Sequence, residues 1–159
     1  MPTDEGMSCI VGEKWRHFGV NDGLPTDWTR YVFEDREGSL WVASIGVHRL
    51  IGRGFWTSWR RAQGLPGDTI WDIHRDRRGR LWVATDKGLC RATTQGWRVL
   101  SGTEKASTRR IHEDARGRLW ISLMPAAILL YDPAENRIVR YSKASGVIGT
   151  QIISLEEDG

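Results

Sequence analysis

Four short segments of the chain carry tryptophan, arginine and aspartate in a pattern suited to binding a polar ligand. Each segment follows a glycine, at position 23, 64, 102 or 146. The candidate ligand-binding residues at their variable positions are Trp28, Arg30, Asp68, Trp71, Arg109, Arg110 and Gln151. An exposed indole can stack on a sugar ring, while arginine and aspartate hydrogen-bond hydroxyl groups or a carboxylate. The alternative is that Trp71 packs inside the fold and that the charged residues are only solvated.

Two histidines, His74 and His112, each stand two residues before an equivalent aspartate. A metal site would need a third ligand of suitable geometry. Phe33 occupies the same position in another part of the chain, which favours a packing role for both histidines. We therefore predict no metal ligand at these positions.

The regular recurrence of Asp35, Asp76 and Asp114 suggests at first a calcium-binding loop in each repeat. Such a loop needs further oxygen ligands at alternate positions, but Arg77 and Arg116 are among the residues that stand in these turns. We interpret the three aspartates as turn formers.

No catalytic constellation is recognisable in the sequence. Neither a Ser-His-Asp order, nor paired carboxylates in an apolar pocket, nor a glycine-rich phosphate loop can be assembled. The carboxylates that a hydrolase or lyase would have to use are Asp27, Asp68, Asp72 and Glu156, and nothing selects them. We predict that this chain has no catalytic residue and binds no cofactor and no metal.

The elements that must position these residues are repeats. The aspartates at 35, 76, 114 and 158 recur after 41, 38 and 44 residues, and so do the glycines at 23, 64, 102 and 146. Self-similarity at this period indicates an array of small units. The recurring positions that we assign to structure are Asp35, Gly38, Trp41, Asp76, Gly79, Trp82, Asp114, Gly117 and Trp120.

Each unit contains four short apolar runs separated by turn signals. In the second unit they cover residues 70–74, 81–85, 89–92 and 97–100. Asp76 and Gly79 occupy the first and fourth positions of a type I turn, which predicts a hairpin between the first two runs. No window shows a convincing helical period, so we predict four antiparallel strands in each unit.

A four-stranded sheet with apolar residues on both faces must be covered by neighbours, and a ring of such sheets provides that cover. The predicted fold class is therefore all-β: a β-propeller fragment of four-stranded antiparallel blades, with about three complete blades and two partial ones. The expected boundaries are 1–22 for the end of a preceding blade, 23–63, 64–101 and 102–145 for blades, and 146–159 for the start of a further blade. We expect the chain to be truncated within a repeat at both ends.

The composition excludes two classes of partner. Of the 159 residues, 40% are hydrophobic, and no apolar run reaches the length of a membrane span, so no membrane contact is expected. The net charge of +3 comes from scattered arginines without a basic stripe, so nucleic acid is not an expected partner. Most of the nine tryptophans fall at repeat positions or in strand-like runs and are predicted to lie in the core.

The repeated motif resembles the two-component regulator propeller repeat. The resemblance rests on Gly-Leu-Pro at Gly23 and Gly64, on the acidic or basic residue and aspartate before each turn, and on Gly-x-Leu-Trp at Trp41, Trp82 and Trp120. It covers nearly the whole chain, although Gly102 and Gly146 are not followed by Leu-Pro. In that family, tandem repeats build the extracytoplasmic sensor of histidine kinases, hybrid two-component regulators or diguanylate cyclases.

The resemblance implies a non-catalytic piece of a ligand-sensing propeller, periplasmic or extracytoplasmic in its parent protein. No signal peptide is recognisable in residues 1–20. The expected partners are a small-molecule or oligosaccharide ligand, the neighbouring blades and, through open strand edges, a second copy of the chain. Two alternatives remain open at this point: a propeller scaffold for protein–protein interaction, and a carbohydrate-active propeller enzyme.

Overall fold

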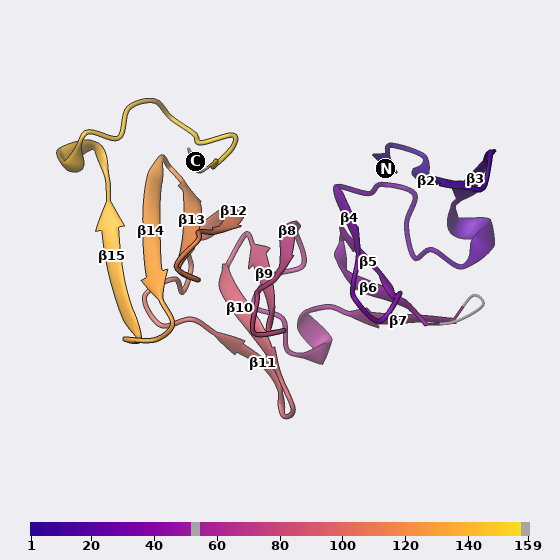
Figure 1. The fold of residues 1–159 in the computed structure, drawn as a ribbon, viewed down its shortest axis with the longest axis horizontal. Helices are drawn as coiled ribbons and strands as arrows, with labels where there is room; N and C mark the ends of the chain where they lie inside the picture. The colour runs from indigo at the N-terminus through magenta and orange to yellow at the C-terminus, as the bar shows by residue number, and fades with distance from the viewer. Residues whose placement is uncertain (52–54, 157–159) are drawn as a thin grey trace.

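The computed structural model describes residues 1–51 and 55–156, and it consists of antiparallel sheets arranged in sequence order (Figure 1). The N-terminal sheet has three strands: β1 (Pro2–Thr3), β2 (Gly6–Val11) and β3 (Lys14–Phe18). Three four-stranded sheets follow. Their strands are β4 (Tyr31–Glu34), β5 (Leu40–Ser44), β6 (Gly46–Ile51) and β7 (Phe55–Trp59); β8 (Ile70–Arg75), β9 (Leu81–Thr85), β10 (Gly88–Thr93) and β11 (Gly96–Val99); and β12 (Ser107–Glu113), β13 (Leu119–Met124), β14 (Ala127–Asp132) and β15 (Arg137–Tyr141).

These sheets confirm the predicted all-β propeller fold class. Each one is an up-and-down meander in which every strand bonds to the next one along the chain. Trp41, Trp82 and Trp120 take the same place in successive sheets, opposite Phe33, His74 and His112 of the first strands. The four-stranded sheets fall inside the ranges 23–63, 64–101 and 102–145.

The turn between the first two strands forms because its aspartate and glycine suit it. The amide of Gly79 donates to the carbonyl of Asp76 at 2.8 Å, and Gly38 and Gly117 make the same bond to Asp35 and Asp114. Gly79 has a φ of +77°, in the left-handed region that glycine enters without steric cost. The local sequence thus closes each hairpin.

The core lies between sheets. One apolar cluster joins β4–β7 to β8–β11 and includes Trp41, Val47, Ile73 and Val83. A second joins β8–β11 to β12–β15 and includes Trp82, Leu89, Ile121, Leu129 and Tyr131. Each sheet is therefore sheltered from water by its neighbours, as propeller blades are.

Short 3-10 helices connect the sheets: η1 (Val20–Asp22), η2 (Arg61–Gln63) and η3 (Lys143–Ser145). Each ends at a left-handed glycine, and these are Gly23, Gly64 and Gly146. Within the described ranges, no helix is long and apolar enough to cross a membrane.

The segment predicted to start a further blade differs from expectation. Asp158, its marker, lies outside the described residues, and residues 151–156 contain no strand. In the other sheets the first strand bonds to the second, and no described residue forms a second strand beside 151–156. Hydrogen bonds to this end of the chain include that from Ala126 N to the Thr150 carbonyl (3.1 Å) and that from Arg110 Nε to the Ile153 carbonyl (3.3 Å).

Candidate functional site

Six of the seven candidate ligand-binding residues lie in or just before the beginnings of the first strands β4, β8 and β12, and Gln151 lies outside them. Strand pairing is interrupted between Ile70 and Asp72 in β8 and between Thr108 and Arg110 in β12. The residues at these irregularities are Trp71 and Arg109. An extra residue of this kind redirects its side chain out of the strand's alternation, and such bulges are frequent beside functional sites.

The structure brings together four of the seven predicted ligand-binding residues, and we call them the tryptophan–arginine stack: Trp28, Arg30, Trp71 and Arg109. The Arg30 guanidinium carbon lies 4.1 Å from the ring centre of Trp28 and 3.8 Å from that of Trp71. The guanidinium carbon of Arg109 lies 3.4 Å from the same Trp71 ring. These distances are well within the range of cation–π attraction. Three successive sheets thus contribute to one polar and aromatic cluster.

Three N–H groups of the stack have no hydrogen-bond partner among the described residues. They are Arg30 Nε, Trp71 Nε1 and Arg109 Nε, and all three atoms are buried. Burial and, secondarily, the charge of Arg109 lower the pKa of Arg30 from its usual value. Unpaired buried donors next to two positive charges favour an acceptor, and an oxyanion or a hydroxyl-rich molecule supplies one.

A second set of side chains directly follows three members of the stack in the sequence: Tyr31, Asp72 and Arg110. Asp72 is buried and accepts hydrogen bonds from the amides of Ile73 and Ile111, both at 2.9 Å. Burial raises the pKa of Asp72 to about 6, although these bonds and the charge of Arg110 act against the rise. The bond to Ile111 crosses between sheets, so Asp72 helps to hold two blades together.

The other predicted residues lie apart from the stack. Asp68 accepts a hydrogen bond from Arg61 N at 2.8 Å, and the equivalent Asp27 accepts one from Val20 N at 2.8 Å. Both aspartates therefore hold the start of a 3-10 helix. Arg110 donates to the carbonyl of Ile153, and Gln151 is exposed.

The recurring aspartates and tryptophans make a contact that the sequence reasoning missed. In each four-stranded sheet the indole N–H donates to the turn aspartate, at 2.7 Å for Trp41 to Asp35 and 2.8 Å for Trp82 to Asp76. The third pair is Trp120 and Asp114, at 2.9 Å. The constant spacing of six residues was a signal that could have revealed it. Burial acts to raise the pKa of Asp114, but the Trp120 indole and Arg118 lower it to about 2.

His74 takes part in a contact between sheets, and His112 lies opposite Trp120 within its own sheet. His74 Nε2 lies 3.5 Å from Glu113 Oε2, and burial lowers the pKa of His74 while Glu113 opposes that shift. In the described part of the chain, no group of three His, Cys, Asp or Glu residues could hold a metal ion. A buried histidine that the sequence reasoning did not single out, His48, hydrogen-bonds with Ser44 and Ser58.

Comparison with known proteins identifies the repeat. Residues 64–87 match the family model described as "Two component regulator propeller". The resemblance expected from the sequence is thereby confirmed in this unit. The chain is a run of β-propeller blades that carries a two-component regulator propeller repeat. A search of curated proteins finds no match.

Solved structures share the fold. An extracellular domain from B. thetaiotaomicron, described as part of a hybrid two component system, is 24% identical with a TM-score of 0.81, over 96% of this chain and 22% of that one. A second, described as part of a one component system, is 23% identical with a TM-score of 0.71, over 88% of this chain and 20% of that one. The chain thus spans about a fifth of the length of these structures.

An enzyme has the same fold. The virginiamycin B lyase from Staphylococcus aureus is 20% identical with a TM-score of 0.60, over 80% of this chain and 45% of that one. At these identities the likeness shows the architecture alone, and that architecture occurs both in extracellular domains of signalling systems and in a lyase.

Proposed function

We propose that these blades form part of the extracytoplasmic sensor of a bacterial signal-transduction protein, either a two-component sensor kinase or a diguanylate cyclase. The blades bind a ligand and carry out no catalysis themselves. Two observations support this: the regulator propeller repeat at residues 64–87, and the similarity to extracellular domains of signalling systems. The parent protein is accordingly periplasmic or otherwise extracytoplasmic in this region.

The observation that carries the proposal is the tryptophan–arginine stack. Its members come from the beginnings of consecutive first strands, and its three unpaired N–H groups can donate to ligand oxygens. The indoles offer a flat apolar surface of the kind that packs against sugar rings. The ligand class that fits is a small molecule or an oligosaccharide with acceptor oxygens, including carboxylates.

Binding to a panel of neutral and acidic oligosaccharides tests the proposal. Calorimetric titration of the chain should find at least one binder whose affinity falls about tenfold or more in Arg30→Gln, since a charge-assisted hydrogen bond contributes roughly 1.5–3 kcal/mol.

The matched control is Arg16→Gln, because Arg16 also lies over an aromatic ring, that of Phe18, but in the N-terminal sheet. It should bind as the unaltered chain does. Ligand recognition by the stack would be contradicted if no binder in the panel lost affinity in Arg30→Gln, or if every such loss were equalled in Arg16→Gln.

A further inference from the structure

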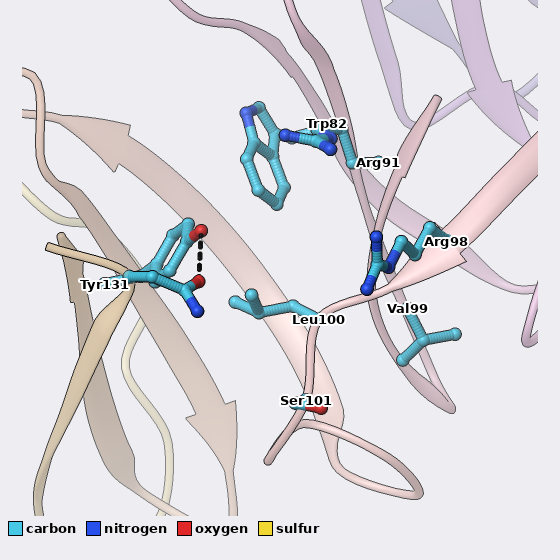
Figure 2. A pocket seen from close by; sticks show the side chains of 8 residues that line it. Trp82, Arg91, Arg98, Val99, Leu100, Ser101 and Tyr131 are labelled. Atoms are coloured by element: carbon cyan, nitrogen blue, oxygen red, sulfur yellow. Dashed lines mark hydrogen bonds between the residues drawn. The ribbon is translucent and has the colours of Figure 1, made fainter. Parts of the chain in front are cut away.

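A cleft that shares no lining residue with the stack lies between the sheet of β8–β11 and the sheet of β12–β15 (Figure 2). It has a volume of about 280 Å³. Trp82, Leu100 and Tyr131 provide its apolar surfaces, and Arg91, Arg98 and Ser101 provide polar groups. This combination of flat apolar surface and cationic donors is that of a small-molecule site.

The two arginines of this cleft face one another across a strand pair. Arg91 of β10 and Arg98 of β11 are directly opposed, so their side chains emerge on the same face of the sheet. Among the described residues, neither forms an ion pair with a carboxylate. Like charges placed directly opposite destabilise a strand pair unless something neutralises them.

The preceding sheet shows how such an arginine is normally neutralised. Arg49 occupies the position of Arg91, and its guanidinium lies 3.8 Å from the carboxylate of Asp35 and donates to Ser39 at 2.9 Å. In the cleft sheet, Arg80 replaces Ser39 and pairs with Asp76 itself. Because Arg80 holds the local carboxylate, Arg91 is left without an anionic partner.

The arginine pair is confined to one of the three four-stranded sheets. The positions equivalent to Arg91 and Arg98 are Arg49 and Thr57 in the first of these sheets and Leu130 and Val139 in the last. The pair is therefore no requirement of the repeat. It is a feature added to the sheet that borders this cleft.

The surroundings of the arginines are held in place by other contacts. The Trp82 indole is fixed by its bond to Asp76, and the ring of Tyr131 meets it edge-on with the centres 5.7 Å apart. The Tyr131 hydroxyl donates to Asn136 Oδ1 at 3.2 Å, as the dashed line in Figure 2 shows. This leaves the Asn136 amide N–H groups as further donors at the edge of the cleft.

We propose that this cleft binds the oxyanion group of a small ligand, a carboxylate, sulfate or phosphate, between the guanidinium groups of Arg91 and Arg98. Guanidinium matches the geometry of such groups with paired hydrogen bonds. The apolar part of the ligand packs against Trp82 and Leu100. The site is separate from the tryptophan–arginine stack and does not depend on the function proposed for it.

Calorimetric titration of the chain with inorganic sulfate, inorganic phosphate and glucuronate tests the site at low ionic strength, where screening is weak. The inorganic ions probe the arginine pair alone, and glucuronate adds a ring to pack against Trp82. At least one probe should bind, and Arg91→Gln and Arg98→Gln should each weaken it about tenfold, with a larger loss in the double variant. Tighter binding of glucuronate than of the inorganic ions would identify an acidic sugar as the preferred source of the oxyanion.

Two controls make the result decisive. Arg140→Gln removes an exposed arginine from a fourth strand that does not border the cleft, and Arg16→Gln removes an exposed arginine from the N-terminal sheet. Both should bind the probes unchanged. The proposal is overturned if no probe binds, if the double variant binds as the unaltered chain does, or if either control loses as much affinity as the double variant. Cooperative unfolding with midpoints no lower than that of the unaltered chain will show that the variants are folded.

Discussion

The two junctions between the four-stranded sheets use opposite charges at equivalent positions. At the first junction, Arg75 at the end of β8 reaches back to the preceding sheet, where its guanidinium lies 3.3 Å from Asp35 and also pairs with Glu37. At the second, the equivalent residue is Glu113, and it accepts the backbone N–H of Arg77 at 2.9 Å. Blades of one repeat thus meet through complementary charges that differ from junction to junction, which favours one order of neighbours over others.

The junctions also differ in how buried polar groups cross them. At the second junction the Thr108 hydroxyl donates to backbone carbonyls of Thr85 and Gly88 and accepts the amide of Thr85. At the first junction the apolar Ile70 occupies the position of Thr108, and the Gly46 amide donates to the Asp68 carbonyl at 2.7 Å. The second junction also has a backbone bond of this kind, from Lys105 N to the Lys87 carbonyl at 3.3 Å, so the junctions differ in the buried side chain, Thr108 or Ile70.

Charge reversal at the first junction should have the largest effect on stability. Arg75→Glu places a carboxylate against Asp35, whose side chain is fully buried, and against Glu37. We expect a loss of about 3 kcal/mol in the free energy of unfolding, measured with urea.

Arg75→Gln removes the attraction of residue 75 to Asp35 and Glu37 without adding the repulsion that Arg75→Glu introduces. Asp35 keeps Arg49 in this variant, and the Arg75 side chain is partly exposed, so the expected loss is only about 1 kcal/mol. Equal losses in the two variants would show that the carboxylates across the junction do not act on residue 75.

Removing the hydroxyl at the second junction should have an intermediate effect. Thr108→Val keeps the shape of the side chain but leaves the Thr85 amide and two carbonyls without this partner in a buried place. The expected loss is about 1–3 kcal/mol of unfolding free energy.

Ile70→Val is the comparison at the first junction, since it removes one methylene from a buried apolar residue and should cost about 0.5–1.5 kcal/mol. If Thr108→Val cost no more than Ile70→Val, the hydroxyl would be dispensable, and the two junctions would differ in charge alone.

A further expected effect is a pH dependence of opposite sign at the two junctions. Burial raises the pKa of Asp72 from 3.8 to about 6, so its contribution to stability is present at acid pH and is lost as the pH rises through this window. The pKa of Asp35 is lowered instead, because hydrogen bonds from Trp41 and Ser39 and the nearby arginines outweigh its burial. Its contribution is present above the unfolded value and is lost as the pH falls.

Asp72→Asn isolates the first of these effects. The stability of the unaltered chain relative to Asp72→Asn should fall between pH 3.8 and about 6 and stay level above that. The difference between the two chains cancels the contribution of His48, whose pKa burial lowers to about 4. A difference that is constant across this range would show that Asp72 does not titrate there.

Much of the fold could be predicted from the sequence because its signals are local. The run Leu81–Thr85 was expected as a strand and is β9 with the same bounds. The Asp-x-x-Gly turns were predictable for the same reason, since their bonds span a few residues. Residues 146–159 were expected to start a further blade, but their described part forms no strand, because strand formation there depends on a partner and not on local propensity.

The candidate site was predictable only in part. Residue types and equivalent positions were enough to name Trp28, Arg30, Trp71 and Arg109. Their stacking depends on bulges in β8 and β12, which no residue pattern predicted. Arg91 lacks a carboxylate partner because of the residue eleven positions earlier. This residue is Arg80, whereas the equivalent position of the previous sheet holds Ser39. Such relations become visible only when the sheets are placed side by side.

The bond between the indole and the turn aspartate joins groups only six residues apart in each sheet. Contacts across the junctions join groups separated by far more chain, 39 residues for Ile111 and Asp72. Closing a short loop costs less entropy than closing a long one. Each hairpin can therefore form before the contacts between sheets do. The sheets then assemble by docking of hairpins whose turns have already formed.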